Sequence, residues 1–148
     1  MKVEIRIIPE QEDTTVVIQT PTMTDQAEEL ANYIRTWTPL ALTLRQGNTV
    51  VRCSPAEILH FFAENKGVSA RHSDGQVFSV DCRLYELEEL LDPHTFVRIS
   101  HSEIVNLKQL TALDLSLSGT IKMTLANGAA VCYASRRYVK KIKQALGL

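Results

Sequence analysis

Basic side chains crowd the C-terminal end of this 148-residue sequence, and such side chains bind phosphate and other anions. On a helical wheel at about 100° per residue, five of them fall on one side, opposite an apolar side. The basic side carries Arg136, Arg137, Lys140, Lys141 and Lys143, and the apolar side carries Tyr138, Val139, Ile142 and Leu146. The helix alone leaves three interpretations open: a solvated charged face, a membrane-surface contact and a nucleic-acid contact.

The start of this predicted helix suits a phosphate oxygen. Ser135 is expected to cap the helix, which places backbone N–H groups and the positive end of the helix dipole beside Arg136 and Arg137. Arginine can also grip O6 and N7 of guanine, so one arginine can read a base while its neighbour and Lys140 hold the DNA backbone. The sequence does not divide these roles between Arg136 and Arg137.

A second candidate is the polar segment 100–103, which lies between two apolar segments. Ser100, His101 and Ser102 can exchange hydrogen bonds with base edges or phosphates. The alternative is a turn stabilised by its own hydroxyl groups, and the residues alone favour it. Asn106, between two apolar residues, is interpreted as a structural residue that ties loop backbone together.

The residues do not indicate catalysis, a cofactor or a metal. None of the four histidines lies in an HExxH, GxSxG, P-loop or Cys-His pattern, so we expect no enzyme. The three cysteines are widely spaced, without a C-x-x-C pair or a histidine at ligand spacing, and they are interpreted as reduced, mostly buried thiols. The residues concerned are His60, His72, His94, His101, Cys53, Cys82 and Cys132.

The candidate residues need a scaffold, and the sequence from residue 42 onward predicts a mainly β one. Turn residues between β-branched or apolar runs predict three hairpins and a last strand. The hairpins cover 42–51, 68–80 and 113–125, and the last strand covers 129–133. A further strand is predicted at 96–99, and residues 100–107 are expected to be irregular or turn-rich.

Helices are predicted at three places besides the C-terminus. Ser54 and Glu57 can form a capping box around Pro55, so a short helix starts there, whereas 58–62 can continue it or become a buried strand. A leucine stripe predicts a core helix over 84–91. Thr24 can cap a helix whose apolar stripe packs on N-terminal strands or forms a dimer face. That stripe comprises Ala27, Leu30, Ala31, Ile34 and Trp37.

Residues 1–41 are expected to form a small β-β-α extension, with strands at 3–7 and 15–18. The chain is electrically polarised, because residues 1–42 hold three basic and seven acidic side chains, whereas residues 94–148 hold eight basic and two acidic ones. A basic part joined to an acidic part is typical of a nucleic-acid reader with a separate control or pairing element. No apolar run is long enough to cross a bilayer, so we expect a cytoplasmic protein.

Three motifs, in order, resemble the LytTR family of DNA-binding domains. Residues 96–107 read FVRISHSEIVNL, 125–128 read LANG and 134–138 read ASRRY. The family pattern is roughly F-x-R-x-H-[RK]-S-x-x-V-N, then an N-G hairpin, then S-R-[RK]-[YN] at the start of the last helix. The resemblance spans about residues 42 to 148.

The resemblance implies a domain of short antiparallel sheets with a C-terminal helix, of class α+β and mainly β, whose loops enter successive major grooves. The base-reading residues would be Ser100, His101 and Ser102 together with Arg137, and a third contact would come from the loop at Asn65, Lys66 and Gly67. Arg98, Arg136, Ser135 and Lys140 complete the expected DNA-binding set. Ser100 and His101 stand where the family commonly has histidine and a basic residue, so the target sequence is expected to differ.

The resemblance also implies partners. About forty residues precede the domain, which are too few to hold a receiver domain. We expect a transcription regulator that binds paired promoter elements on double-stranded DNA as a homodimer joined through residues 1–40. Short family members resemble regulators restrained by a small membrane protein, which makes such an inhibitor a further expected partner. The main alternative is a protein-interaction module of LytTR shape without DNA binding; an RNA-binding module lacks support from aromatic or G-x-x-G motifs.

Overall fold

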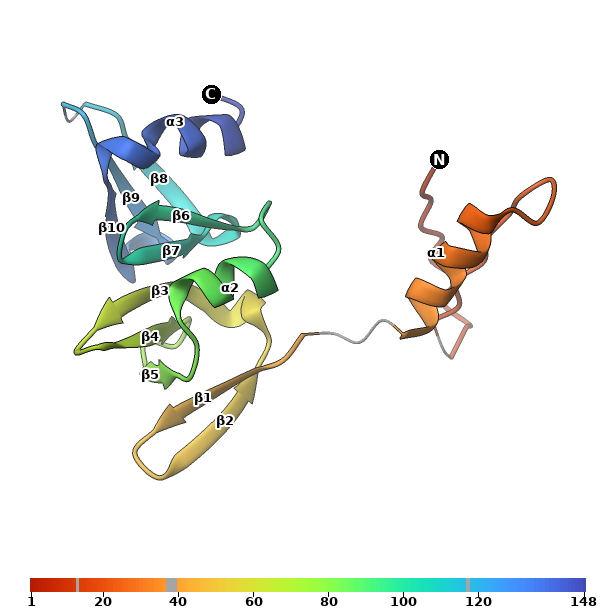
Figure 1. Ribbon diagram of the computed structural model, residues 1–148, viewed down its shortest axis with the longest axis horizontal. Coiled ribbons are helices and arrows are strands. Elements are labelled where there is room, and N and C mark those ends of the chain that lie inside the picture. The colour runs from red at the N-terminus through yellow and green to blue at the C-terminus, as the bar shows by residue number, and fades with distance from the viewer. Residues whose placement is uncertain (13, 37–39, 117) are drawn as a thin grey trace. The chain divides into compact units, whose positions relative to one another are not determined.

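The structure, a computed structural model, describes residues 1–12, 14–36, 40–116 and 118–148. The chain divides into two compact units, Met1–Thr38 and Pro39–Leu148 (Figure 1). Within the described residues, no helix has both the length and the apolar character needed to cross a membrane.

The N-terminal unit contains helix α1 (Asp25–Thr36), which begins as predicted. The Thr24 hydroxyl accepts a hydrogen bond from the Ala27 N–H at 3.2 Å, and acidic Asp25 and Glu28 lie in the first turn, where they complement the helix dipole. The apolar stripe of α1 is only half-buried, and part of it lines a hollow together with Ile18 and Met23. Trp37, predicted to end the stripe, lies outside the described residues.

The two strands predicted in residues 1–20 are wrong, because the described residues there contain none. The chain does turn between them, since the Gln11 N–H donates to the Ile8 carbonyl at 3.0 Å. Val3, Ile5 and Ile7 are each more than 80% exposed, at 82%, 87% and 87%. An alternating pattern supplies an apolar face but not the neighbouring backbone that a strand needs, and an isolated two-stranded hairpin is marginal in water.

Strands dominate the C-terminal unit, as the mainly β fold class predicted. Its seven-stranded antiparallel sheet has the order β2-β1-β5-β4-β3-β7-β6, and a three-stranded sheet has the order β10-β9-β8. The larger sheet comprises β1 (Leu42–Gln46), β2 (Thr49–Cys53), β3 (Ile58–Glu64), β4 (Gly67–His72), β5 (Val77–Val80), β6 (Phe96–Ser100) and β7 (Glu103–Asn106). The smaller sheet comprises β8 (Leu110–Asp114), β9 (Ile121–Leu125) and β10 (Ala130–Ala134). The α-helices among the described residues of this unit are α2 (Leu84–Leu90) and α3 (Arg136–Ala145).

The capping box at Ser54 forms as predicted. The Glu57 carboxylate accepts a hydrogen bond from the Ser54 N–H at 3.0 Å, and the resulting helix is a single 3-10 turn, Pro55–Glu57. The ambiguous segment that follows is strand β3, so its apolar run belongs to a strand buried on both faces.

Two apolar clusters lie on opposite faces of the larger sheet. The first joins α2 to the sheet around Phe61, Leu87 and Ile104, and the second joins the smaller sheet and α3 to it around Val105 and Ile142. Adjacent residues of β7 therefore belong to different clusters, as the two-residue period of a strand requires. Full burial of Ile142 alone contributes roughly 1.5–3 kcal/mol, which fixes α3 on the domain.

Two predicted segments differ from the structure. Residues 100–107 were expected to be irregular, but Glu103–Asn106 is strand β7, whose burial on both faces removes the polar-apolar alternation that would have indicated a strand. The strand predicted at 113–117 instead spans Leu110–Asp114, and Leu117 lies outside the described residues.

Candidate nucleic-acid interface

Two loops meet at one edge of the larger sheet because β3 and β7 are antiparallel partners. Phe62 pairs with Glu103, and the Ala63 N–H donates to the Ser102 carbonyl at 2.8 Å. The end of β3 and the start of β7 therefore lie side by side. The hairpin tip at Asn65 and Lys66 and the turn before Glu103 consequently belong to the same edge of the sheet.

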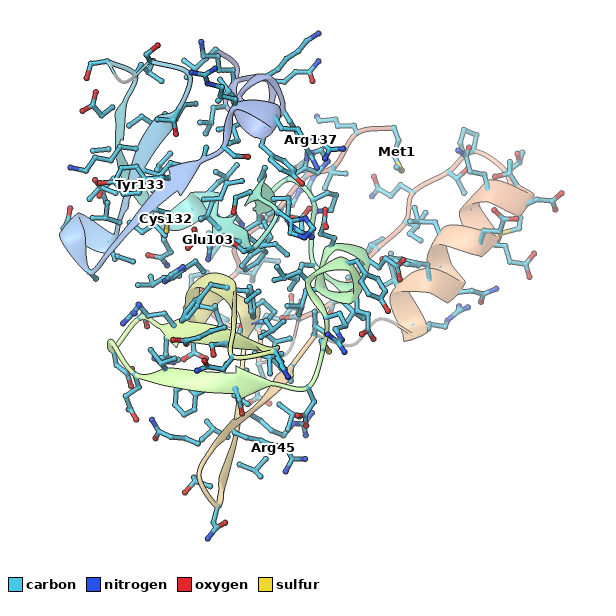
Figure 2. All side chains as sticks on the ribbon, turned by 60° about the vertical axis from the view of Figure 1, so that its left-hand side comes forward. Met1, Arg45, Glu103, Cys132, Tyr133 and Arg137 are labelled. Carbon is cyan, nitrogen blue, oxygen red and sulfur yellow. The ribbon has the colours of Figure 1, made fainter. Side chains whose placement is uncertain are left out.

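The start of α3 is attached to this edge by a backbone hydrogen bond. The Ser135 N–H donates to the Ile99 carbonyl at 2.9 Å, just before β6 enters the turn. Figure 1 shows α3 lying over β6, and Figure 2 shows Arg137 at the beginning of the helix. Two segments that the sequence analysis selected separately, 100–102 and 135–137, are thus brought together.

The turn between β6 and β7 is stabilised by its own hydroxyl groups. The Ser102 N–H donates to the Ser100 hydroxyl at 3.2 Å, and the two hydroxyl oxygens are 3.4 Å apart. His101 and Ser102 are exposed. Among the described residues, nothing hydrogen-bonds the His101 ring, so the turn presents a free imidazole at its tip.

Arg98 holds this turn from inside the domain. Its guanidinium donates to the Ser100 carbonyl at 2.8 Å, to the His101 carbonyl at 2.5 Å and to the Glu88 carboxylate of α2 at 2.5 Å. The side chain is only 12% exposed. Arg98 was selected as a DNA-binding candidate, but each of its three guanidinium nitrogens already donates a hydrogen bond within the protein.

The β3–β4 hairpin tip is a tight turn with exposed side chains. Asn65 and Lys66 have φ angles of 48° and 63°, the pair of left-handed conformations that a type I′ hairpin turn requires. Both side chains are exposed. Lys66 therefore offers an ammonium group to solvent at the same edge as the turn at 100–102.

Ser135 occupies the predicted N-cap position of α3, but the prediction that its hydroxyl caps the helix is wrong. The residue is extended, with φ −78° and ψ 154°, and its side chain makes no capping bond. Instead the Tyr138 N–H donates to the Ser135 carbonyl at 2.9 Å. The exposed hydroxyl therefore does not bond the first turn, where the N–H groups of Arg136 and Arg137 precede the first helical hydrogen bond.

The two arginines at the start of α3 differ in their surroundings. Arg136 packs against the turn at Gly119 so closely that a methyl group on that glycine would collide with its guanidinium. Arg137 is exposed, and no described residue holds it by a hydrogen bond or ion pair. The amphipathic pattern of α3 is confirmed, since its apolar side joins the core while its five basic residues are exposed. Arg136, Lys140 and Lys143 also line a shallow surface hollow.

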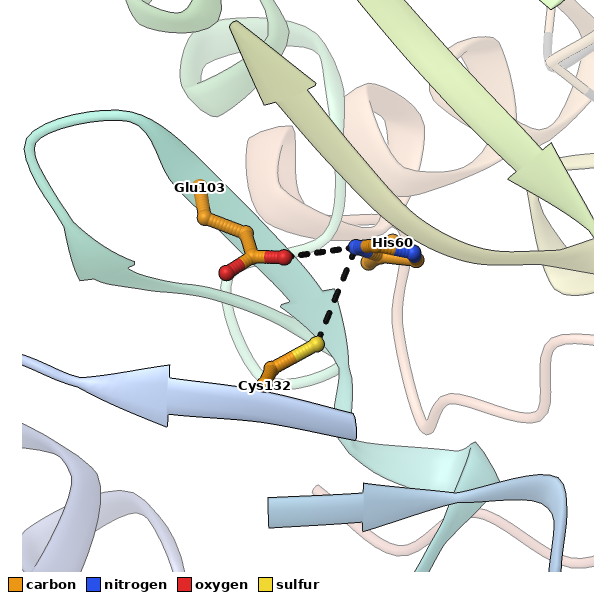
Figure 3. A group of neighbouring side chains, drawn as sticks. All are labelled: His60, Glu103 and Cys132. Carbon is orange, nitrogen blue, oxygen red and sulfur yellow. Dashed lines mark hydrogen bonds and ion pairs between the residues drawn. The ribbon is translucent and has the colours of Figure 1, made fainter. Parts of the chain in front are cut away.

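A group of buried and half-buried side chains lies behind the turn, and nothing in the sequence indicates that its members come together. The Glu103 carboxylate is 2.6 Å from Nδ1 of His60, and Nε of Arg71 donates to Nε2 of the same ring at 3.2 Å. Because a guanidinium only donates, the ring proton lies on Nδ1 and is donated to Glu103. Cys132 Sγ is 3.7 Å from Nδ1 (Figure 3), and burial together with the Glu103 charge raises the pKa of its thiol.

Comparisons with known proteins agree with these features. Residues 48–147 match the family model of the LytTr DNA-binding domain. Two uncharacterized HTH-type transcriptional regulators of Staphylococcus aureus, from strains MSSA476 and MW2, are each 33% identical to the chain over 156 residues, and the alignments cover 100% of this chain and 99% of each relative. A solved LytTr DNA-binding domain from Bacillus cereus has a TM-score of 0.69 at 21% identity, covering 73% of this chain and 97% of that one. At that identity the match shows a shared fold.

The name of these relatives refers to a helix-turn-helix, which the described part of this chain does not contain. Strands β1 to β5 separate α1 from α2, and β6 to β10 separate α2 from α3. Basic side chains and exposed loops instead come together at the edge formed by the two turns and the start of α3.

Proposed function

The chain belongs to the LytTR family of DNA-binding domains, as its motifs predicted, and on this basis we propose that residues 42–148 bind double-stranded promoter DNA in a sequence-specific manner. The hydrogen bond from Ser135 to Ile99 carries the proposal, because it joins an exposed turn to the basic start of α3. Loops and helix ends that protrude from a rigid sheet are typical recognition surfaces.

The surroundings of each side chain suggest its role at the DNA. The free guanidinium of Arg137 can form the bidentate contact to guanine, whereas Arg136 lies against the Gly119 turn and suits a backbone phosphate together with Lys140. Lys140 lies one turn after Arg136 in the same hollow. Arg98 acts through the turn that it holds, so we propose it as a positioning residue.

The turns would supply two further contacts. Ser100, His101 and Ser102 would meet base edges or phosphates next to Arg137, with the Ser102 hydroxyl and the His101 ring as the exposed groups. Asn65 and Lys66 would reach the backbone at the other turn of the same edge. These contacts would place the domain on one face of the duplex.

Pairing of two chains through the N-terminal unit would let the regulator occupy neighbouring elements. Support comes from apolar side chains that remain exposed in that unit, among them Val3, Ile5 and Val17. Apolar groups of this kind gain free energy when a second copy covers them. Linking two binding events raises the overall affinity without new DNA contacts. An inhibitor in the membrane remains a prediction from the family resemblance.

Selection from random duplex DNA, with sequencing of the bound pool at two salt concentrations, tests this function. We expect an enriched element repeated at a helical-turn spacing, and an affinity that falls steeply with salt. The control variant Lys2→Ala removes an exposed basic side chain outside the C-terminal unit and should select the same DNA element. Failure to enrich any sequence would contradict DNA recognition and favour the alternative, a protein-interaction module. The exposed apolar residues of the N-terminal unit support that alternative.

A further inference from the structure

Three side chains from different strands place metal-binding atoms together behind the turn at 100–102. They are His60 of β3, Glu103 of β7 and Cys132 of β10, and Figure 3 shows all three directed at one another. The ring nitrogen, carboxylate oxygen and sulfur lie within 4.8 Å of one another. An imidazole, a carboxylate and a thiolate are all ligands that zinc accepts.

The spacing of these atoms is close to that of a tetrahedral zinc site. Zinc bound to nitrogen and sulfur at its usual distances sets those atoms about 3.6 Å apart, and His60 Nδ1 and Cys132 Sγ are 3.7 Å apart. The carboxylate of Glu103 is closer, at 2.6 Å from Nδ1, and would have to withdraw to roughly 3.4 Å. Its side chain is 18% exposed at the edge of the sheet, so it can shift toward solvent, and solvent would supply a water as fourth ligand.

Burial favours a site of this kind over a loose surface contact. The His60 side chain is 9% exposed, and its ring stacks on Phe62 with centroids 4.9 Å apart. Cys132 is 2% exposed and fixed by pairing with Met123 of β9. The two ligands are therefore pre-positioned by packed strands, and little side-chain freedom remains to be lost when an ion binds.

Arg71 is the residue of the cluster that opposes the binding of a cation. Its Nε donates to Nε2 of His60, which requires the ring proton on Nδ1, where a metal would bind. On metal binding the ring proton moves to Nε2, the thiol proton leaves to solvent, and Arg71 must release Nε2 and turn outward. The half-buried Arg71 side chain can do so, because its other contact, to the Gly75 carbonyl, is long at 3.5 Å.

We propose that His60, Glu103 and Cys132 form a binding site for Zn²⁺ or a similar borderline divalent cation, with Arg71 as the group that the metal displaces. The site joins both segments of the candidate DNA interface. Glu103 directly follows Ser102, and Cys132 lies on the strand that leads to Ser135. An ion held between them would stiffen the turn against the start of α3; this effect on DNA rests on the proposed function, whereas the site itself does not.

Cobalt(II) added to the full chain, after removal of metal with a chelator, tests the site. We expect one equivalent to give the near-ultraviolet charge-transfer absorption of a cobalt–thiolate bond, and Zn²⁺ to displace it. Cys132→Ser should abolish the absorption, whereas Cys53→Ser and Cys82→Ser, which alter the other two free cysteines, should leave it unchanged. Arg71→Gln replaces the competing donor with a group that can accept from Nε2, and should tighten binding by roughly tenfold or more.

Glu103→Gln provides a second ligand variant, and circular dichroism without metal checks that each variant folds. The Glu103→Gln substitution should weaken cobalt binding while keeping the thiolate absorption. Absence of binding by the wild-type chain at micromolar metal, or survival of the absorption in Cys132→Ser, would overturn the proposal. If zinc binds but no duplex does, the proposed function fails and the metal site stands.

Discussion

The Ser135 N–H donates a hydrogen bond to the Ile99 carbonyl at 2.9 Å, and this contact joins two segments that lie far apart in the sequence. Ile99 is the last buried residue before the turn at 100–102, and Ser135 is the last residue before α3. Since both residues are in backbone contact, a side chain of the turn and a side chain of the first helical turn can face the same stretch of DNA.

Arg98→Ala is expected to weaken specific DNA binding, because we propose that Arg98 positions the turn at 100–102. Loss of its hydrogen bonds to the Ser100 and His101 carbonyls should free the turn and lower the free energy of unfolding by about 1–3 kcal/mol. Arg98→Lys should not restore specific binding, because an ammonium group lacks the planar fork. Titration of the selected duplex and chemical denaturation measure the two effects.

Glu88→Gln separates positioning from direct contact. The substitution removes a negative charge, which by electrostatics alone would strengthen DNA binding, but it also weakens the ion pair that orients Arg98. We therefore expect weaker specific binding and little change on random duplex. Stronger binding to both duplexes would contradict this positioning role, because the lost charge alone would then explain the result.

Gly119→Ala is expected to displace the Arg136 side chain. Gly119 has φ 73°, and an added methyl group meets the guanidinium of Arg136. Gly47→Ala is the matched control, since Gly47 has φ 58° and open space around it, so it should lose only the backbone cost of about 1–2 kcal/mol. The guanidinium is the end of a flexible, exposed side chain and can move aside at little cost, so we expect thermal unfolding to show similar losses for both glycine variants. Titration with DNA should separate them, because only Gly119→Ala moves Arg136 and should weaken binding to all duplexes. Equal DNA binding by the two variants would contradict a role of the Gly119 turn in placing Arg136.

His101→Arg should raise DNA affinity and its dependence on salt. The exposed ring at the tip of the turn would be replaced by a permanent cation able to hold a phosphate. One added phosphate contact makes the slope of log K against log salt steeper by about 0.9. His94→Arg adds the same charge at another exposed histidine and serves as control. An equal change in both variants would mean that general charge, and not the turn, causes the effect.

Ile5→Asp or Val17→Asp should shift the chain from dimer toward monomer. Both side chains are exposed, at 87% and 72%, and would be covered in a dimer joined through this unit. Thr14→Asp adds the same charge at an exposed polar position and should leave the association state unchanged. Sedimentation equilibrium measures the outcome. A wild-type chain that is monomeric at micromolar concentration would contradict pairing through this unit.

Local sequence signals predicted much of the fold. The capping box at Ser54 and the two-sided pattern of α3 each depend on neighbours within one helical turn, so the sequence shows them directly. Strand β7 escaped prediction because both its faces are buried. The prediction of strands at the N-terminus was wrong for the opposite reason. Their apolar residues alternate as in a strand, but these side chains stay exposed in the described unit.

The sequence predicted which residues belong to the candidate site but not the contacts among them. The motifs selected Ser100 to Ser102 and Arg137, yet the sequence could not show that Arg98 is engaged by Glu88 or that the Ser135 hydroxyl makes no cap. The cluster of His60, Glu103 and Cys132 carries no sequence signal, because strands from two different sheets bring these residues together. Long-range pairing, not local spacing, creates that site.

The most direct test of the central claim compares Arg137→Ala with Lys140→Ala on the selected duplex and on random duplex. Arg137→Ala should cost about 1–3 kcal/mol on the selected duplex only and relax the preference at one base pair. Lys140→Ala should weaken both duplexes similarly and reduce the salt slope by about one. Equal losses on both duplexes for Arg137→Ala would contradict base reading by the start of α3.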